Sequence, residues 1–336
     1  MNGLNTVNII QNNMIQHHQY QLAKRGKWIC PECGHKTFVC YVDANGQVLN
    51  ERVGKCDRAD KCAYHYPPRE YFADNKIVFD AKQHRPSRPM FRPQPRPSYI
   101  HPDVFKQSVT ATMSHRNHLI TYLNGVFGEE LVSKMITDYY IGTSKHWESS
   151  TVFWQIDRFG HIHGGKIMQY NPDNGKRVKE PHNRITWVHT AMKMPDYNLR
   201  QCLFGEHLLS KYPDRIVALF ESEKTAIIAS TIFGDTITLA CGGCGNLTPA
   251  MCEPLRGRDV VLFPDNGKFD EWGKKGEQMS KMFSSLRIAN IMERVASRCG
   301  DDLGDLIVEN CRLLAQCPDW VFPYRVIPTD FGLVDL

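Results

Sequence analysis

Four cysteines near the start of the sequence have the spacing of a metal site. Cys30 and Cys33 form a C-x2-C pair, and Gly34 after it allows the tight turn that points backbone amides at thiolates. Cys56 and Cys62 form a second pair. Between the pairs, strand-like TFVCYVD, an ANG turn and VLNERVGKC predict a β-hairpin. Four thiolates brought together in this way predict a closed, tetrahedral, structural Zn²⁺ site.

Two histidines and a fifth cysteine leave the ligand set partly open. His65 is three residues after Cys62 and is an alternative to either member of the second pair, and His35 adjoins the first pair. Cys40 lies in an alternating strand pattern, so we interpret it as a residue of a strand face. A domain of about 45 residues has little core, so the metal would contribute much of its stability. We predict a zinc ribbon over residues 27–75. Its ligands are Cys30, Cys33, Cys56 and Cys62, with His65 in reserve.

Two carboxylates stand where predicted strands end. Glu221 follows the apolar run IVALF, and Asp265 follows VVLFP. In a parallel sheet both side chains emerge at the carboxyl edge, where open α/β sheets place their sites. Carboxylate oxygens suit Mg²⁺, although an acid after a strand also caps the next helix. We predict that Glu221 and Asp265 hold a catalytic Mg²⁺ or Mn²⁺, with Asp270 or Asp302 as a third ligand.

An alternation of strands and helices over residues 213–336 must position these acids. We expect strands at 215–221, 236–242, 259–265 and 288–295, and helices at 222–233, 269–286 and 302–314. This alternation predicts a largely parallel sheet with helices on both faces. The C-x2-C of Cys241 and Cys244 has no partner pair, and we interpret it as a turn at a strand end.

Three other segments complete the predicted organisation. Residues 1–26 are polar and weakly ordered or helical, and residues 76–99 form a basic Pro/Arg linker. Residues 100–212 mix a helical pattern at 117–136 with strand-like runs at 151–157 and 165–171. The sequence thus predicts a multidomain protein of α+β and α/β class.

The positive charge is concentrated in the linker. The net charge of the 336 residues is +5, and residues 81–101 alone supply it, because they contain no acid. The charges are those of Lys82, Arg85, Arg88, Arg92 and Arg96. A basic segment beside a neutral body is typical of a protein that binds a polyanion; the alternative is a solvated spacer.

Composition excludes several other classes. Hydrophobic residues make up 42% and charged residues 23%, as in a folded protein rather than a disordered one. No apolar run approaches the roughly 18 residues that span a bilayer, and the start lacks the basic flank and apolar core of a secretory signal. We expect a cytoplasmic protein without membrane contact, whose 12 cysteines bind metal or are buried rather than form disulfides.

Residues 216–309 resemble a Toprim domain, the metal-binding fold shared by bacterial replicative primases, topoisomerases and some nucleases. Glu221 in ALFESEKTA matches the Glu after that family's first strand, and Asp265 in LFPDNG matches the first Asp of its Asp-x-Asp motif. GDDLGDLI resembles the acidic segment that follows Toprim cores in primases.

The chain departs from the Toprim pattern at three positions. Gly267 stands where the motif has its second Asp, so Asn266 or Asp270 would have to replace that ligand. Ser222 and Thr225 stand where the family usually has a Gly and often an Asp.

The order of parts resembles that of bacterial and phage replicative primases, namely a zinc ribbon, a middle primase-core-like region and a Toprim domain. GKCDRADKCAYHYPPREYF and FESEKTA are similar to primase-like proteins of Bacteroides-type bacteria and their mobile elements. The resemblance covers residues 30–310. It implies primer synthesis in DNA replication, with single-stranded DNA and nucleoside triphosphates as partners. No P-loop is present, so a helicase would be a separate protein.

Under this resemblance, basic side chains would hold template or triphosphate. They are Arg85, Arg88, Arg92 and Arg96 of the linker and Lys166, Arg177 and Lys179 of the middle region. The missing second Asp favours an alternative, a non-catalytic zinc-ribbon/Toprim-like DNA-binding protein of a mobile element. A Toprim nuclease is disfavoured by the zinc ribbon and the order of parts.

Overall fold

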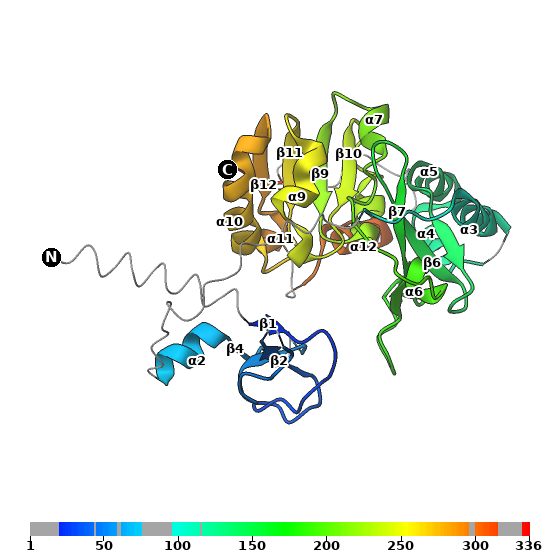
Figure 1. Ribbon diagram of the computed structural model, residues 1–336. Coiled ribbons are helices and arrows are strands. Elements are labelled where there is room, and N and C mark those ends of the chain that lie inside the picture. Colours follow the sequence, from blue (N-terminus) through cyan, green and yellow to red (C-terminus); the bar gives the residue numbers. More distant parts are fainter. Residues whose placement is uncertain are drawn as a thin grey trace. The chain divides into compact units, whose positions relative to one another are not determined.

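The computed structural model describes residues 20–43, 45–58, 62–75, 96–114, 116–295, 300–314 and 331–336 (Figure 1). The chain divides into two compact units, Met1–Pro93 and Gln94–Leu336. Arg85, Arg88 and Arg92 of the predicted linker lie outside the described residues.

The smaller unit is built on a four-stranded antiparallel sheet in the order β1-β2-β3-β4. Its elements are β1 (Gln21–Leu22), β2 (Phe38–Val42), β3 (Gly54–Cys56), β4 (His65–Tyr66) and helix α2 (Pro68–Asp74). The pairing of β2 with β3 is the predicted hairpin, which is therefore confirmed. Strand β1 is a correction, because Gln21 and Leu22 pair with β2 although the sequence placed them in a weakly ordered or helical segment.

The larger unit begins with helices and an antiparallel sheet in the order β5-β6-β7-β8. The helices are α3 (Pro102–Ser114), α4 (His118–Phe127), α5 (Glu129–Tyr139), α6 (Val188–Ala191) and α7 (Leu208–Lys211). The strands are β5 (Gly142–Ser144), β6 (Ser150–Ile156), β7 (Ile162–Met168) and β8 (Ile185–Trp187). The helical pattern at 117–136 forms two helices rather than one, because Gly128 adopts a φ of 80° between them.

A five-stranded sheet in the order β10-β9-β11-β12-β13 follows, and it is parallel except for β13. Its strands are β9 (Ile216–Phe220), β10 (Thr236–Ala240), β11 (Asp259–Phe263), β12 (Ser285–Ala289) and β13 (Leu333–Asp335). The α-helices are α8 (Glu223–Ala229), α9 (Pro249–Cys252), α10 (Phe269–Met279), α11 (Ile291–Val295) and α12 (Leu303–Leu314). Single 3-10 turns are η1 (Cys244–Asn246), η2 (Glu253–Leu255) and η3 (Ser280–Met282).

One strand prediction in this region was wrong. Residues 288–295 were expected to be a strand, but β12 begins at Ser285 and residues 291–295 form α11. Ile288, Ile291, Met292 and Val295 are spaced with the period of a helix, and this pattern belongs to the helix that follows the strand. The strand itself, Ser285–Ala289, overlaps the end of the predicted helix and the start of the predicted strand.

Helices cover both faces of the parallel sheet, as predicted. Leu262 and Leu286 approach Gly276 so closely that a Cβ there would lie 3.2 Å and 3.4 Å from their methyl groups, so α10 covers their face. Leu239 is on the same face, because it pairs through Leu219 with Leu262. Thr238 therefore faces the other side, where its hydroxyl donates to the Ala226 carbonyl of α8 at 2.7 Å.

The two sheets of the larger unit share one hydrophobic core, which joins residues from Leu119 to Cys311. Phe204 forms an isolated antiparallel bridge with Ala240 and so pairs the edge strand β10. The Tyr139 hydroxyl donates to the Thr238 carbonyl at 3.1 Å. The antiparallel and parallel sheets consequently lie side by side in Figure 1, with β7 next to β10.

Candidate functional site

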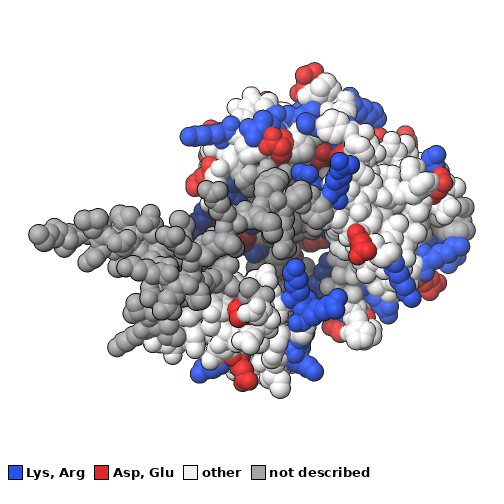
Figure 2. Space-filling model, viewed as in Figure 1, with Lys and Arg blue, Asp and Glu red and all other residues white. Residues whose placement is uncertain are grey.

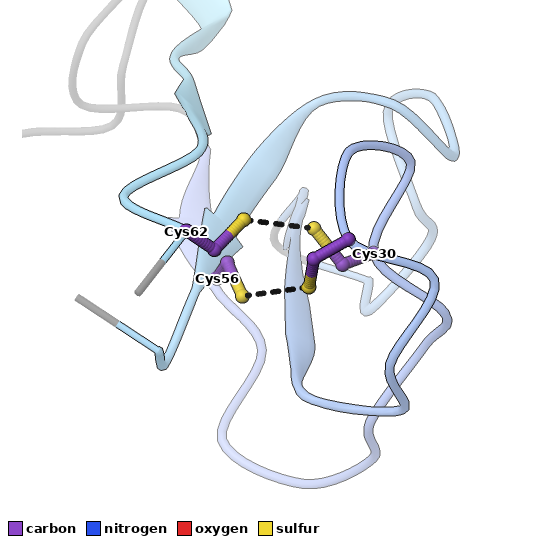
Figure 3. A group of neighbouring side chains, drawn as sticks. Cys30, Cys56 and Cys62 are labelled. Carbon is purple, nitrogen blue, oxygen red and sulfur yellow. Dashed lines mark hydrogen bonds between the residues drawn. The ribbon is translucent and has the colours of Figure 1, made fainter. Parts of the chain in front are cut away.

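The four predicted cysteines meet in the smaller unit. Their sulfur atoms all lie within 4.8 Å of one another. The Cys30 and Cys62 sulfurs are 3.7 Å apart, and the Cys33 and Cys56 sulfurs are 3.9 Å apart (Figure 3). Tetrahedral zinc with bonds of about 2.3 Å places its sulfur ligands about 3.8 Å apart, so both the spacing and the donor type fit zinc.

Backbone amides support this arrangement. The N–H groups of His35, Arg58 and Tyr64 donate to the sulfurs of Cys33, Cys56 and Cys62, respectively. The His35 amide lowers the pKa of the Cys33 thiol to about 6, which favours the thiolate that binds metal.

The reserve ligand and the fifth cysteine are placed elsewhere. The His65 imidazole hydrogen-bonds to the Tyr41 hydroxyl at 3.1 Å and is not part of the four-sulfur group. Cys40 is fully buried in the core of the smaller unit, as expected for a residue of a strand face.

At the carboxyl edge of the parallel sheet, Glu221 lies among lysines. Burial raises the pKa of Glu221, while the Cys244 amide and the nearby Lys268 and Lys275 act to lower it. One of its oxygens, Oε2, is buried without a hydrogen-bond partner. Glu271 bridges the two lysines at 3.0 and 2.8 Å, so this half of the edge carries compensating cations.

Asp265, in contrast, lies among other acids. Burial, followed by the charges of Asp302, Glu221 and Asp305, raises the pKa of Asp265 to about 8. Lys224 opposes this shift. The acidic segment beginning at residue 301, which the sequence assigned to the same edge, thus reaches Asp265.

Two backbone hydrogen bonds bring that segment to the edge. The Asn266 amide donates to the Asp301 carbonyl at 2.9 Å, and the Gly300 amide donates to the Asn266 carbonyl at 3.0 Å. Asp302 is 8% exposed and accepts hydrogen bonds from the Thr225 hydroxyl at 2.6 Å and the Asp305 amide at 2.9 Å. Thr225 stands where the Toprim pattern often has an Asp, and here its hydroxyl hydrogen-bonds to the carboxylate of another acid, Asp302.

The acids at this edge do not by themselves fit a divalent cation. Among the described residues, only the four cysteines bring three or more ligand atoms within 4.8 Å. Asp270 is exposed in the first turn of α10 and is not among the main groups that shift the pKa of Asp265 or Glu221. Carboxylate oxygens have the right chemistry for Mg²⁺, but their number and spacing in the free chain are insufficient.

Lys166 is a correction to the predicted nucleic-acid contacts. It is 5% exposed, forms an ion pair with the buried Glu223 and donates to the Gly242 carbonyl at 2.9 Å. An ammonium held in this way joins β7 to the edge of the parallel sheet and cannot also hold a template phosphate.

The other predicted basic contacts are more accessible. Lys179 and Arg96 are exposed, and Arg177 is half-buried next to Tyr170. Figure 2 shows basic and acidic side chains interspersed over the viewed face of the larger unit. Lys179, Arg96 and Arg177 stay predictions of nucleic-acid contacts.

Glu223 and Lys224 are residues that the sequence analysis missed. They follow Glu221 in the first turn of α8, where charged side chains usually face solvent. The sequence signal for them was the run of charged residues in ESEK directly after a buried strand.

The Cys241–Cys244 segment is the predicted turn, in which the Cys241 thiol donates to the Gly243 carbonyl at 3.4 Å.

Comparisons with known proteins identify the smaller unit more clearly than the larger one. A family model described as a zinc beta-ribbon finger matches residues 18–77, and one described as a domain of unknown function (DUF6371) matches residues 117–266. No curated protein matches. The zinc-ribbon match and the four-cysteine cluster together support a structural zinc ion.

Solved structures similar to this chain include three primases. The primase fragment of the bacteriophage T7 primase-helicase is 12% identical, with 89% of this chain and 100% of that chain covered and a TM-score of 0.37. The E. coli primase catalytic core is 10% identical, with 62% of this chain and 74% of that chain covered and a TM-score of 0.41. A DnaG primase catalytic domain bound to single-stranded DNA is 13% identical, with 58% of this chain and 60% of that chain covered and a TM-score of 0.33. Scores this low leave the function to be inferred from this chain itself.

Within the described part of the chain, every helix is too short or too polar to cross a bilayer.

Proposed function

We propose that this chain is a primase-like protein that binds single-stranded DNA and joins nucleotides at the carboxyl edge of its parallel sheet. The observation that carries the proposal is the placement of Glu221 and Asp265 just after the paired parallel strands β9 and β11, at the same edge of the sheet. Open α/β sheets bind ligands at this edge. The resemblance of the ESEKTA and LFPDNG segments to a Toprim domain, behind a zinc ribbon, supports the same function.

In this proposal the three acids have different tasks. Glu221, with a raised pKa and a buried oxygen that has no partner, would accept the proton of the primer hydroxyl. Asp265 and Asp302 would orient the incoming triphosphate. Mg²⁺ or Mn²⁺ accompanying the nucleotide would neutralise charge on its phosphates.

Primer synthesis on single-stranded DNA with labelled nucleotides and Mg²⁺ or Mn²⁺ tests this function. Glu221→Gln keeps the shape but removes charge and basicity, so we expect it to abolish synthesis and leave DNA binding intact. We expect the same of Asp265→Asn. The matched control is Glu253→Gln, which changes an exposed acid paired with Arg256 and should not alter synthesis. Full activity of both edge variants would exclude this edge as the active site.

DNA binding by the basic linker is a separate part of the proposal. Replacing Arg85, Arg88, Arg92 and Arg96 with Gln should weaken binding to single-stranded DNA. Each lost phosphate contact lowers the slope of log K against log salt by about 0.7, so four contacts would lower it by about 2.8. An unchanged slope would make the segment a spacer.

A second candidate function is a DNA-binding protein without catalysis. Two observations favour it, namely Gly267 in place of an acid and Lys224 among the remaining acids. Tight binding of single-stranded DNA by a chain that never synthesises primers would decide for this candidate.

A further inference from the structure

A lysine ammonium contacts the carboxylate cluster of the sheet edge, which consists of Asp265, Asp302 and Asp305. The Lys224 Nζ atom is 3.3 Å from Asp305 Oδ1. The side chain is only 17% exposed, whereas that of Asp305 is 52% exposed. Helix α8 sets the position of Lys224, because the Ser222 hydroxyl accepts a hydrogen bond from the Thr225 amide and the helix begins at that turn.

The carboxylates compensate the cost of burying this ammonium. Burial acts to lower the pKa of Lys224, but Asp302 and Asp305 outweigh it and raise the pKa overall. Lys224 in turn acts against the rise in the pKa of Asp265 and of Asp302. One cation is thus ion-paired with Asp305 and carries the charge that opposes the pKa shifts of the other two acids.

The start of helix α12 packs closely against Asp302 and helix α8. A Cβ at Gly304 would lie 3.0 Å from Asp302 Oδ1 and 3.4 Å from the Thr225 Cα atom. Asp302 is therefore held against α8 and already accepts two hydrogen bonds. These two hydrogen bonds, one to each oxygen, fix the orientation of its carboxylate.

We propose that Lys224 is the resident cation of the Asp265, Asp302 and Asp305 cluster and keeps divalent ions out of it in the nucleotide-free protein. The inference deepens the proposed function, on which it rests for the identity of the site. A divalent ion would have to enter this cluster against an ammonium that is already bound there, and like charges at such distances repel strongly. Lys224 would thus make metal binding depend on substrate.

Equilibrium Mn²⁺ binding to the zinc-loaded full chain, followed by the paramagnetic resonance of free Mn²⁺, tests the inference without DNA or nucleotide. We expect the wild type to bind no stoichiometric Mn²⁺ at sub-millimolar concentration. Lys224→Met should raise the Mn²⁺ affinity at least tenfold. Lys224→Arg keeps the charge and should behave as the wild type. Lys268→Met removes a lysine next to Glu221, outside the cluster, and should change the affinity less than about twofold.

Stoichiometric sub-millimolar binding by the wild type would overturn the inference, and so would an unchanged affinity in a folded Lys224→Met variant. Circular dichroism and zinc content establish folding; should Lys224→Met not fold, the wild-type measurement still decides. If the wild type binds Mn²⁺ weakly but does not synthesise primers, the proposed function is wrong and this inference stands. If the wild type synthesises primers but binds free Mn²⁺ tightly, the inference is wrong and the proposed function stands.

Discussion

The cysteine cluster and the carboxylate cluster gather anionic groups in two different ways. In the smaller unit, four sulfurs lie within 4.8 Å, and their partners are backbone amides, one another, the Thr37 hydroxyl and the His35 imidazole. In the larger unit, the ammonium of Lys224 is ion-paired with Asp305, and its charge opposes the rise in the pKa of Asp265 and of Asp302. The first cluster is complete only with a metal ion, whereas the second contains its own cation.

The difference shows that clustered ligands alone do not define a metal site. Thiols of neighbouring cysteines need a cation that the side chains around them do not supply, and zinc provides it. Carboxylates can instead be balanced by a lysine from a neighbouring helix, as Lys224 of α8 is paired with Asp305 of α12, and the cluster then needs no metal to offset its charge. The spacing of the ligand atoms and the presence of an internal cation therefore have to be judged together.

The largest expected effect is loss of the zinc site. Cys33→Ser removes one of four ligands, so the chain should lose its zinc, about one ion per chain, and the smaller unit should unfold. Structural zinc contributes on the order of 10 kcal/mol in small zinc domains. Elemental analysis and limited proteolysis measure both outcomes. Cys40→Ala, which removes a buried thiol outside the cluster, should keep the zinc. Zinc retained by Cys33→Ser would show that the four cysteines are not its ligands.

A second prediction concerns the buried pair of Lys166 and Glu223, which are 5% and 3% exposed. Lys166→Met leaves the Glu223 carboxylate buried without its cation, which should cost about 3–5 kcal/mol in the free energy of unfolding. Changing both residues to Met should restore most of this loss. Denaturant unfolding measures the three variants. A cost below about 1 kcal/mol for Lys166→Met would show that this edge does not depend on internal cations.

A smaller effect is expected at the exposed end of the carboxylate cluster. Asp305→Asn removes the ion pair with Lys224, but Asp305 is half-exposed, so solvent screens the pair. The free energy of unfolding should change by less than about 1 kcal/mol. A much larger loss would mean that Asp305 rather than the buried Asp302 balances the ammonium.

The smallest effect is expected at the buried histidine His207, whose pKa falls on burial although the charge of Asp138 acts to raise it. Burial lowers the pKa of His207 below 6.5, and its Nε2 hydrogen-bonds to the Asp138 carbonyl at 2.9 Å. The unfolded chain therefore takes up the proton first as the pH falls, so His207 contributes stability above pH 6.5 and loses it below. His207→Gln should reduce the decline in melting temperature between pH 7 and 5. If the melting temperature of His207→Gln falls as much as that of the wild type, groups other than His207 cause the loss of stability.

The sequence sufficed for the cysteine cluster and for the strand ends that carry Glu221 and Asp265. Both depend on local spacing, which a turn or a strand converts directly into position. It did not suffice for Lys166 and Lys224, because a lysine in a strand or in the first helical turn has the same local pattern whether it faces solvent or a buried acid. Their partners, Glu223 and Asp305, lie 57 and 81 residues away in sequence. Only the packing of the sheets and helices brings these pairs together.

The bridge between Phe204 and Ala240 has a consequence for how the larger unit melts. It joins a residue of the predicted primase-core-like region, 100–212, to an edge strand of the predicted Toprim-like domain, 213–336, within a core that both share. A fragment beginning at residue 213 would expose that edge strand to water, together with the core residues that pack against the missing part. We therefore expect residues 96–336 to unfold in one cooperative calorimetric transition, and the isolated fragment 213–336 to aggregate through its unpaired strand.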